Sequence, residues 1–159
     1  MHAYLFPGLR LTPQAVANLV RAIPPGRWDQ AVEPGRFTLR EAIAHLADWE
    51  PIFRERIQAG LEQDGATILG MDEEVRAIEQ GYQDWDVLET LERFAREREA
   101  TIRLLEGLTS AQWDRKVIHN ERGEMSTRDQ ANLILGHDIY HLEHLTQYLA
   151  GDDRIASVW

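Results

Sequence analysis

The sequence predicts an all-α protein, a four-helix bundle with short extra helices in its loops. Three observations lead to this prediction. Apolar residues recur at helical spacing over most of the chain, helix-start signals precede the long stretches, and strand signals are nearly absent. The 159 residues are enough for one domain with a buried core, and we expect that domain to span residues 1–159.

The first two helices each follow a start signal. Thr12 offers a hydroxyl as N-cap and Pro13 suits the first helical position. The apolar face that follows comprises Val16, Leu19, Val20 and Ile23. Residues 24–26 should end this helix, and residues 38–41 form a capping box that opens the second. We expect Pro51 to kink the second helix or break it locally.

Two further long helices are predicted in the second half. The third should span residues 84–107, with an apolar stripe formed by Leu88, Leu91, Ala95, Ile102 and Leu105. Arg98 falls inside this stripe, which is unusual for a charged residue. The fourth should start at Ser126, with Asp129 as the matching acid of a capping box, and run to Gly151.

The connections carry weaker signals. Residues 60–70 are predicted to form a loop, followed by a short helix over residues 71–80. Residues 114–126 are compatible with a short hairpin or an irregular loop.

Composition excludes several functional classes. The absence of cysteine excludes disulfides, thiolate catalysis and cysteine-based zinc sites. The net charge of −10 disfavours nucleic-acid binding, because an acidic surface repels phosphates. No apolar run reaches bilayer length and the first residues lack signal-peptide features, so we expect no membrane association and a cytoplasmic location.

Histidines supply the candidate chemistry. Each residue of a helix advances about 100°, so His137, His141 and His144 lie on one face. A spacing of four residues lets two imidazoles bind one ion. His45 shares the apolar face of its own helix with Trp49. Both helices therefore direct histidine toward the bundle interior, where such folds build metal sites.

Other interpretations compete with a metal site. A single core-facing histidine such as His45 is more often a hydrogen-bonded packing residue than a ligand. We interpret His2 and His119 as terminal and loop residues outside the site. The HxxxH motif of metalloproteases requires Glu directly after the first histidine, and Asp138 occupies that place, so that class is excluded.

Several motifs together suggest a family. Residues 44–50 read AHLADWE, residues 71–83 read MDEEVRAIEQGYQ, Trp113 precedes Asp114, and HxxxH lies in the last helix. In this combination, over nearly its whole length, the chain resembles the DinB/YfiT-like superfamily. The resemblance implies a four-helix bundle that holds one divalent metal ion, zinc or nickel, on three histidines.

By position, the resemblance assigns His45, His137 and His141 as the ligands. Many members have glutamine three residues after the last ligand, where this chain has His144. His144 could be a fourth ligand or a neighbour that supports a ligand, and we favour the neighbour. The family commonly forms dimers, so we expect a homodimer.

Two charged residues could assist the metal. Asp48 lies one turn after His45 and could orient a ligand, hold a bound water or act as a base, although an ordinary solvated acid is an equal alternative. Glu50 points to a different face and is a weaker candidate. Arg98 could bind an anionic substrate, but such an arginine more often reaches solvent or pairs with a buried acid.

Two functions fit these predictions. The first is a small metalloenzyme, a hydrolase or transferase, whose ion activates water or a low-molecular-weight thiol for attack on a small-molecule substrate. The second is a non-catalytic, metal-binding, stress-response bundle whose ion holds the helices together. A pocket beside the ion favours the first function, and an ion sealed from solvent favours the second.

Overall fold

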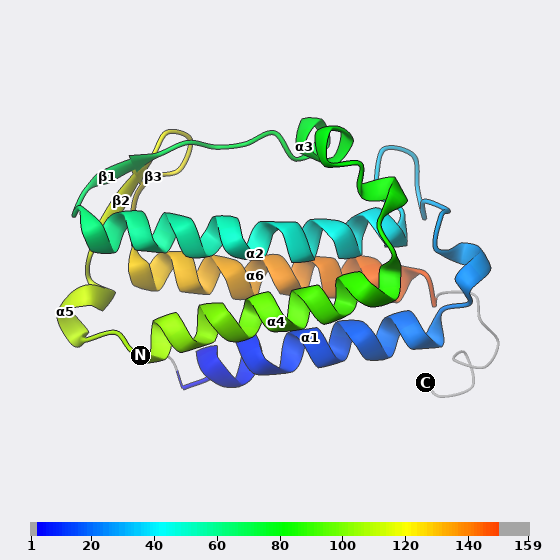
Figure 1. Ribbon diagram of the computed structural model, residues 1–159, viewed down its shortest axis with the longest axis horizontal. Coiled ribbons are helices and arrows are strands. Elements are labelled where there is room, and N and C mark those ends of the chain that lie inside the picture. Colours follow the sequence, from blue (N-terminus) through cyan, green and yellow to red (C-terminus); the bar gives the residue numbers. More distant parts are fainter. Residues whose placement is uncertain (1–2, 150–159) are drawn as a thin grey trace.

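Four long helices form the bundle in the computed structural model, which describes residues 3–149 (Figure 1). They are α1 (Leu5–Ala22), α2 (Leu39–Glu62), α4 (Val87–Glu106) and α6 (Thr127–Gln147). The connections hold η1 (Pro25–Arg27), α3 (Glu73–Gln80), η2 (Tyr82–Asp84) and α5 (Ser110–Trp113). The predicted four-helix bundle with short extra helices is confirmed. In the described part of the chain, no helix is both long and apolar enough to span a membrane.

Local capping explains where the helices begin. The capping boxes at Thr38 and Ser126 are both present, each with its acid hydrogen-bonded back to the cap. Asp86, rather than Asp84, caps α4 by accepting hydrogen bonds from two backbone amides. Helix α6 ends at Gln147, earlier than predicted. The predicted end, Gly151, lies outside the described residues, as does His2.

The predicted start of the first helix is wrong. Helix α1 begins at Leu5, and both Thr12 and Pro13 lie inside it. Proline lacks the amide that would bond the Leu9 carbonyl. In its place the Arg98 guanidinium donates to that carbonyl, with Nη1 and O 3.2 Å apart. The Thr12–Pro13 pair, which resembles a helix start in the sequence, is thus located where α1 contacts Arg98 of α4.

The predicted break at Pro51 is also absent, since α2 continues through it as one helix to Glu62. The prediction of a loop over residues 60–70 is therefore wrong in part. Residues beyond α2 form a short strand, β1 (Ala66–Ile68), and residues 114–126 contain β2 (Lys116–His119) and β3 (Gly123–Ser126). Of the two alternatives left open for the latter segment, the structure has the hairpin.

The three strands form a small sheet in the order β1-β2-β3 at one end of the bundle (Figure 1). Strand β1 pairs in parallel with β2, and β2 pairs antiparallel with β3. Gly60 lets the sheet pack closely on α2, because a Cβ there would lie 2.9 Å from Val117 Cγ1. The sheet therefore joins the end of α2 to the start of α6.

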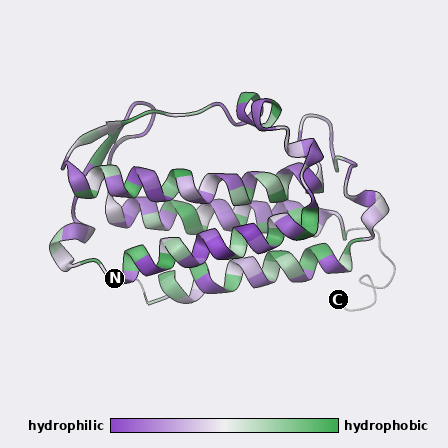
Figure 2. Ribbon diagram, in the orientation of Figure 1, coloured by the Kyte–Doolittle hydropathy of each residue, from purple (hydrophilic) through white to green (hydrophobic). Residues whose placement is uncertain are grey.

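The core contains two large apolar clusters with a polar layer between them, and a small third cluster where α3 and η2 contact α2. One cluster includes Val16, Val20, Ile43, Leu46, Phe94 and Leu145. The other includes Leu5, Leu9, Phe53, Ile57, Ile102 and Ile134. On each long helix, buried polar residues lie between the two sets, for example Thr12 on α1 and Arg98 on α4. Hydrophobic and hydrophilic residues are interspersed along each of the long helices (Figure 2).

The predicted stripe of α4 is partly wrong, because Leu88 is 54% exposed and Ala95 is also exposed. The buried face instead includes Val87 and Phe94, one position before each of these residues.

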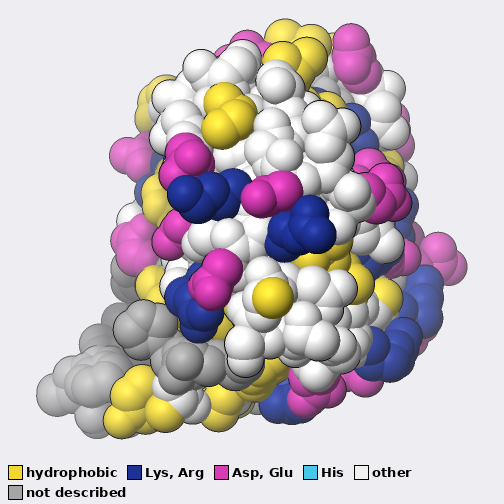
Figure 3. Space-filling model, turned by 90° about the vertical axis from the view of Figure 1, so that its left-hand side faces the viewer, with side chains coloured by type: hydrophobic (Ala, Val, Ile, Leu, Met, Phe, Trp, Pro, Cys, Tyr) yellow, Lys and Arg dark blue, Asp and Glu magenta, His cyan; other side chains and the backbone are white. Residues whose placement is uncertain are grey.

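At the end of the bundle that holds the sheet, acidic and basic side chains are interspersed on the surface (Figure 3).

Candidate metal centre

Helices α2 and α6 bring three histidines together in the polar layer. The capping box at Thr38 starts α2 and places His45 about two turns into the helix, where it is fully buried. His137 and His141 lie one turn apart on α6 and face His45. We call these three residues the histidine cluster.

The nitrogen atoms of the histidine cluster lie close enough to bind one ion. One ligand atom from each of the three residues lies within 4.8 Å of the others. The Nε2 atoms of His45 and His137 are 2.8 Å apart. Their ring centroids are 4.9 Å apart, and that of His141 is 4.8 Å from His45 and 4.6 Å from His137.

Burial keeps the three imidazoles neutral. Burial, together with the positive charges of the nearby Arg98 and Arg122, lowers the pKa of His137 to about 4. Burial, with the neighbouring histidines, also lowers the pKa values of His45 and His141 well below the ordinary range. The rings therefore keep free lone pairs at neutral pH, and the neutral form is the one that binds a metal ion.

The hydrogen-bonding state of the cluster fits a cation. Among the described residues, nothing bonds the Nδ1 atoms of His45, His137 and His141, although all three are buried. Buried polar atoms without partners cost free energy, so they are rare and call for an explanation. Three neutral imidazoles with free lone pairs form a donor set suited to a divalent ion such as zinc or nickel.

Two other histidines lie beside the cluster. His144 is buried, its ring centroid is 6.4 Å from that of His141, and its Nε2 has no partner among the described residues. It stands outside the three-residue set. His119, predicted to lie in a loop, ends strand β2, is also buried, and accepts a hydrogen bond from the Glu121 amide.

Two hollows reach the histidine cluster, one at His137 and the other at His141. The first, about 50 Å³, is lined by His137 together with Trp49, Phe53, Arg56, Glu73 and Arg122, and we call it the His137 hollow. The second, about 180 Å³, is lined by His141 together with Arg36, Phe37, Glu73, Tyr140 and His144, and we call it the His141 hollow. The cluster is therefore not sealed from solvent.

Asp48 faces α3 and η2. Its Oδ2 accepts hydrogen bonds from Arg76 Nε at 2.5 Å and from the Tyr82 hydroxyl at 2.7 Å. The ring of Tyr82 in turn lies edge-on to that of His45, with centroids 6.4 Å apart. The carboxylate thus holds the segment that covers the cluster.

Arg98 forms a buried ion-pair network with two acids. Its Nε donates to Glu50 Oε1 at 2.9 Å, and its Nη2 donates to Asp138 Oδ1 at 2.8 Å. Thr12 donates to Asp138 at 2.6 Å, and Thr101 donates to Glu50 at 2.9 Å. We call these five residues the Arg98 cluster. Of the alternatives for Arg98, pairing with a buried acid is the one observed.

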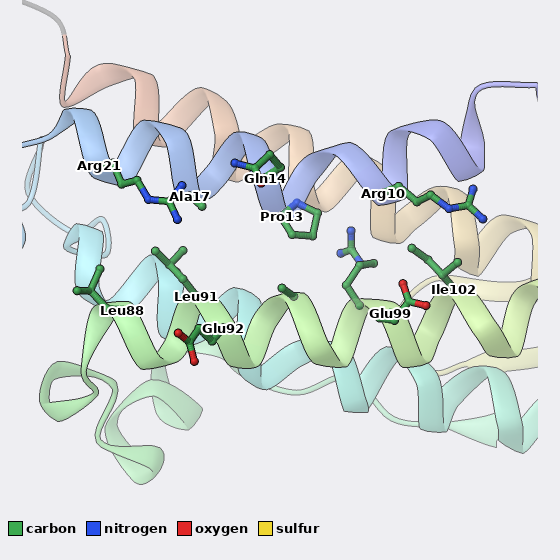
Figure 4. Close-up of a pocket in the computed structure, with 12 residues that line it drawn as sticks. Arg10, Pro13, Gln14, Ala17, Arg21, Leu88, Leu91, Glu92, Glu99 and Ile102 are labelled. Atoms are coloured by element: carbon green, nitrogen blue, oxygen red, sulfur yellow. The ribbon is translucent and has the colours of Figure 1, made fainter.

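A third hollow, about 650 Å³, is an open groove between α1 and α4 (Figure 4). Charged residues border it, with Arg10 and Arg21 on α1 opposite Glu92 and Glu99 on α4. None of the described histidines lines this groove. The candidate chemistry therefore lies at the smaller hollows.

Sequence reasoning missed Glu73 and Arg122 as residues near the cluster. Arg122 lies in the turn between β2 and β3, and Glu73 is the first residue of α3. Glu73 belongs to the acidic stretch that carries part of the family resemblance, so a signal was present. No sequence signal pointed to Arg122, because its turn reaches the site only through the packing of the small sheet.

Comparisons with known proteins agree with this description. A family model described as the DinB superfamily matches residues 9–145. Among solved structures, the chain is similar to YfiT from Bacillus subtilis, described as a probable metal-dependent hydrolase with an unusual four-helix bundle topology. The TM-score is 0.84 at 21% identity, and the match covers 91% of this chain and 83% of YfiT. No curated protein matches the sequence.

Proposed function

The chain belongs to the DinB superfamily, and from this premise we propose that it is a small metalloenzyme. Its histidine cluster holds one divalent ion, zinc or nickel, and the substrate is a small molecule. The observation that carries the proposal is the pair of hollows that reach His137 and His141 from two sides. A purely structural ion would need no such access.

The bound ion would lower the pKa of a coordinated water or thiol and so supply a nucleophile at neutral pH. The protein residues do the rest. The three imidazoles, neutral and buried, present lone pairs from two different helices. Asp48 positions the cover of the site, because Arg76 on α3 and Tyr82 in η2 both bond its carboxylate.

The size and lining of the hollows limit the substrate. Both hollows, about 50 and 180 Å³, are smaller than the roughly 300 Å³ at the lower end of drug-sized sites. Aromatic side chains, including Trp49 and Phe53, line one, and Phe37 and Tyr140 line the other. We therefore expect the reacting end of a small molecule to enter, with hydrolysis or transfer to a thiol as the reaction.

The first test is metal content. Protein purified without a His-tag or a nickel column should contain one divalent ion per chain. His45→Ala, His137→Ala and His141→Ala should each lose it. His119→Ala is the matched control, because His119 lines the His137 hollow but is not in the cluster. His144→Gln should retain the ion if His144 is only a neighbour.

The second test is turnover. Metal-loaded protein should act on ester or amide substrates, or on pairs of a thiol and an electrophile, and lose that activity in the three cluster variants. Protein that binds the ion, gains stability from it and turns over none of these substrates would instead favour the non-catalytic bundle. Retention of metal by all three variants would remove the proposed site.

A further inference from the structure

Glu73 places a carboxylate beside the histidine cluster from a third element of the fold. Its Oε2 lies 4.0 Å from Nε2 of His45, the same nitrogen that contacts His137. Its side chain is 50% exposed, so the carboxylate sits at the boundary between the buried histidines and solvent. Within residues 3–149 this carboxylate accepts no hydrogen bond.

Glu73 is also the residue that the two hollows share. It lines the His137 hollow and the His141 hollow, which otherwise have different walls. This side chain therefore borders both of the hollows that reach the histidine cluster. An ion held by His45 would have the Glu73 carboxylate nearby.

The helix that carries Glu73 is anchored, so this placement is built into the fold. Asp72 caps α3, and Ala77 is buried in the interface with α2. Arg76, three residues after Glu73, forms the ion pair with Asp48, three residues after His45. One short ion pair thus fixes the distance between the two elements that bear Glu73 and His45.

The distance suits coordination of a single ion. A zinc–nitrogen bond and a zinc–oxygen bond each measure about 2.1 Å, so two ligands at a tetrahedral angle lie about 3.4 Å apart. The 4.0 Å between His45 and Glu73 is slightly longer than that separation. The half-exposed side chain retains the freedom to move the remaining fraction of an ångström.

We propose that Glu73 is a fourth protein ligand of the ion, supplied by the cover of the site and not by the bundle. This inference rests on the proposed function, because it needs an ion on the histidine cluster. The carboxylate comes from α3, which is separate from the two helices that carry the histidines. It would complete the coordination of the ion, and an incoming substrate would displace it.

The test compares Glu73→Gln with Glu74→Gln. Glu74 is the next residue, is exposed, and lies in the same first turn of α3, so both variants remove one negative charge from the same helix end. It also lines the His141 hollow but, among the described residues, forms no ion pair with a histidine of the cluster, so the comparison separates a ligand from a charge beside the site. Affinity for Zn²⁺ is measured by competition with a chromophoric chelator. Replacement of residues that only support a metal ligand costs 10–100-fold, so we expect Glu73→Gln to lose at least about tenfold and Glu74→Gln less than about threefold.

Cobalt spectroscopy gives the second readout. The visible absorption of the Co²⁺ protein depends on the number and type of ligands. It should change in position and intensity in Glu73→Gln and superimpose on wild type in Glu74→Gln. Equal loss of affinity in both variants would overturn the proposal, as would an unchanged Co²⁺ spectrum in Glu73→Gln.

Two controls separate this proposal from its premise. Circular dichroism and unfolding of the metal-free variants should match wild type, so that lost affinity is not lost folding. If Glu73→Gln is unstable, Glu73→Ala, which also removes the carboxylate, gives the same comparison. His45→Ala and His137→Ala should abolish binding. If they do not, the histidine site itself fails, whereas wild-type affinity in Glu73→Gln alone refutes only the fourth ligand.

Discussion

Two buried polar clusters lie side by side in the middle of this bundle, and they differ in one respect. In the Arg98 cluster, every charged group is paired, and the guanidinium bonds two carboxylates, a hydroxyl and a backbone carbonyl. In the histidine cluster, three buried ring nitrogens have no partner within the described residues. His137 and Asp138 are adjacent in sequence, yet each belongs to a different cluster.

This difference distinguishes a cluster that stabilises the bundle from a cluster that is a candidate binding site. A buried group whose hydrogen bonds are all satisfied by protein has nothing left to offer a ligand, so the Arg98 cluster joins α1, α2, α4 and α6. A buried group that lacks a protein partner costs free energy, so the histidine cluster is not explained by stability alone. The chain thus places its stabilising polar contacts and its candidate binding site in one layer, distinguished by hydrogen bonding alone.

The largest effect should come from breaking the satisfied cluster. Arg98→Met leaves Glu50 and Asp138 buried without their counter-charge, which should lower the free energy of unfolding by about 3–5 kcal/mol. Urea denaturation of metal-free protein measures this loss. Arg103→Met is the control, because Arg103 is exposed and pairs only with Glu99 on its own helix. Its effect should stay below about 0.5 kcal/mol. Comparable losses in both variants would show that the Arg98 cluster is not structural.

An intermediate effect should come from pH. The pKa of His137 in the folded protein is about 4, against an ordinary value of 6.5. Between these values the unfolded chain binds a proton that the folded, metal-free protein does not. The stability contributed by the neutral ring is therefore complete above pH 6.5 and is lost as the pH falls toward 4, at up to about 1.4 kcal/mol per pH unit.

Comparison with His137→Gln isolates this contribution. In protein treated with a chelator, the stability of wild type should fall relative to the variant as the pH is lowered through that window. Parallel stability curves for the two proteins would contradict the pKa that burial imposes on His137. Glu50 belongs to the other cluster and is present in both proteins, so its titration cancels in the difference.

The smallest effect should come from removing a member of the unsatisfied cluster. His45→Leu replaces a buried ring whose Nδ1 has no partner with an apolar side chain of similar size. The substitution also removes the contact between the Nε2 atoms of His45 and His137. In the absence of metal, the free energy of unfolding should therefore fall by no more than about 1.5 kcal/mol, much less than in Arg98→Met. Thermal unfolding with and without Zn²⁺ checks this, since only wild type should gain stability from the ion. A large loss without metal would assign His45 to the packing role.

Elements with complete local signals could be predicted from sequence. Thr38 and Ser126 cap helices through acids three residues away, and those contacts involve neighbours in the chain. Thr12 and Pro13 carry the same kind of signal but lie inside α1, because their hydrogen-bonding deficits are met by Arg98 on another helix. Strand β1 has only three residues, and its partner lies about 50 residues away, so no local pattern reveals it.

The residues of the candidate site also differ in how far local sequence patterns predict them. The spacing of His137 and His141 on one helix face predicts that they meet, whereas their meeting with His45 depends on how α2 packs on α6. Resemblance to a family supplied that pairing. The acidic stretch that contains Glu73 was part of that resemblance, but its place beside His45 was not predicted, because it depends on the ion pair between Arg76 and Asp48. Asp48 as a residue of the site stays a prediction.

The small sheet has a consequence for how the chain tolerates insertions. Strand β1 comes shortly after α2, and Ser126 is both the end of β3 and the cap of α6. One residue of strand spans about 3.3 Å, more than a metal–ligand bond, so a slip in strand register would move α6 along α2 and separate the histidines. The register of the sheet therefore sets the position of α6 along α2, the two helices that carry the histidine cluster. Extra residues are compatible with the loop between η1 and α2, but an insertion at the junction of β3 and α6 would misalign the site.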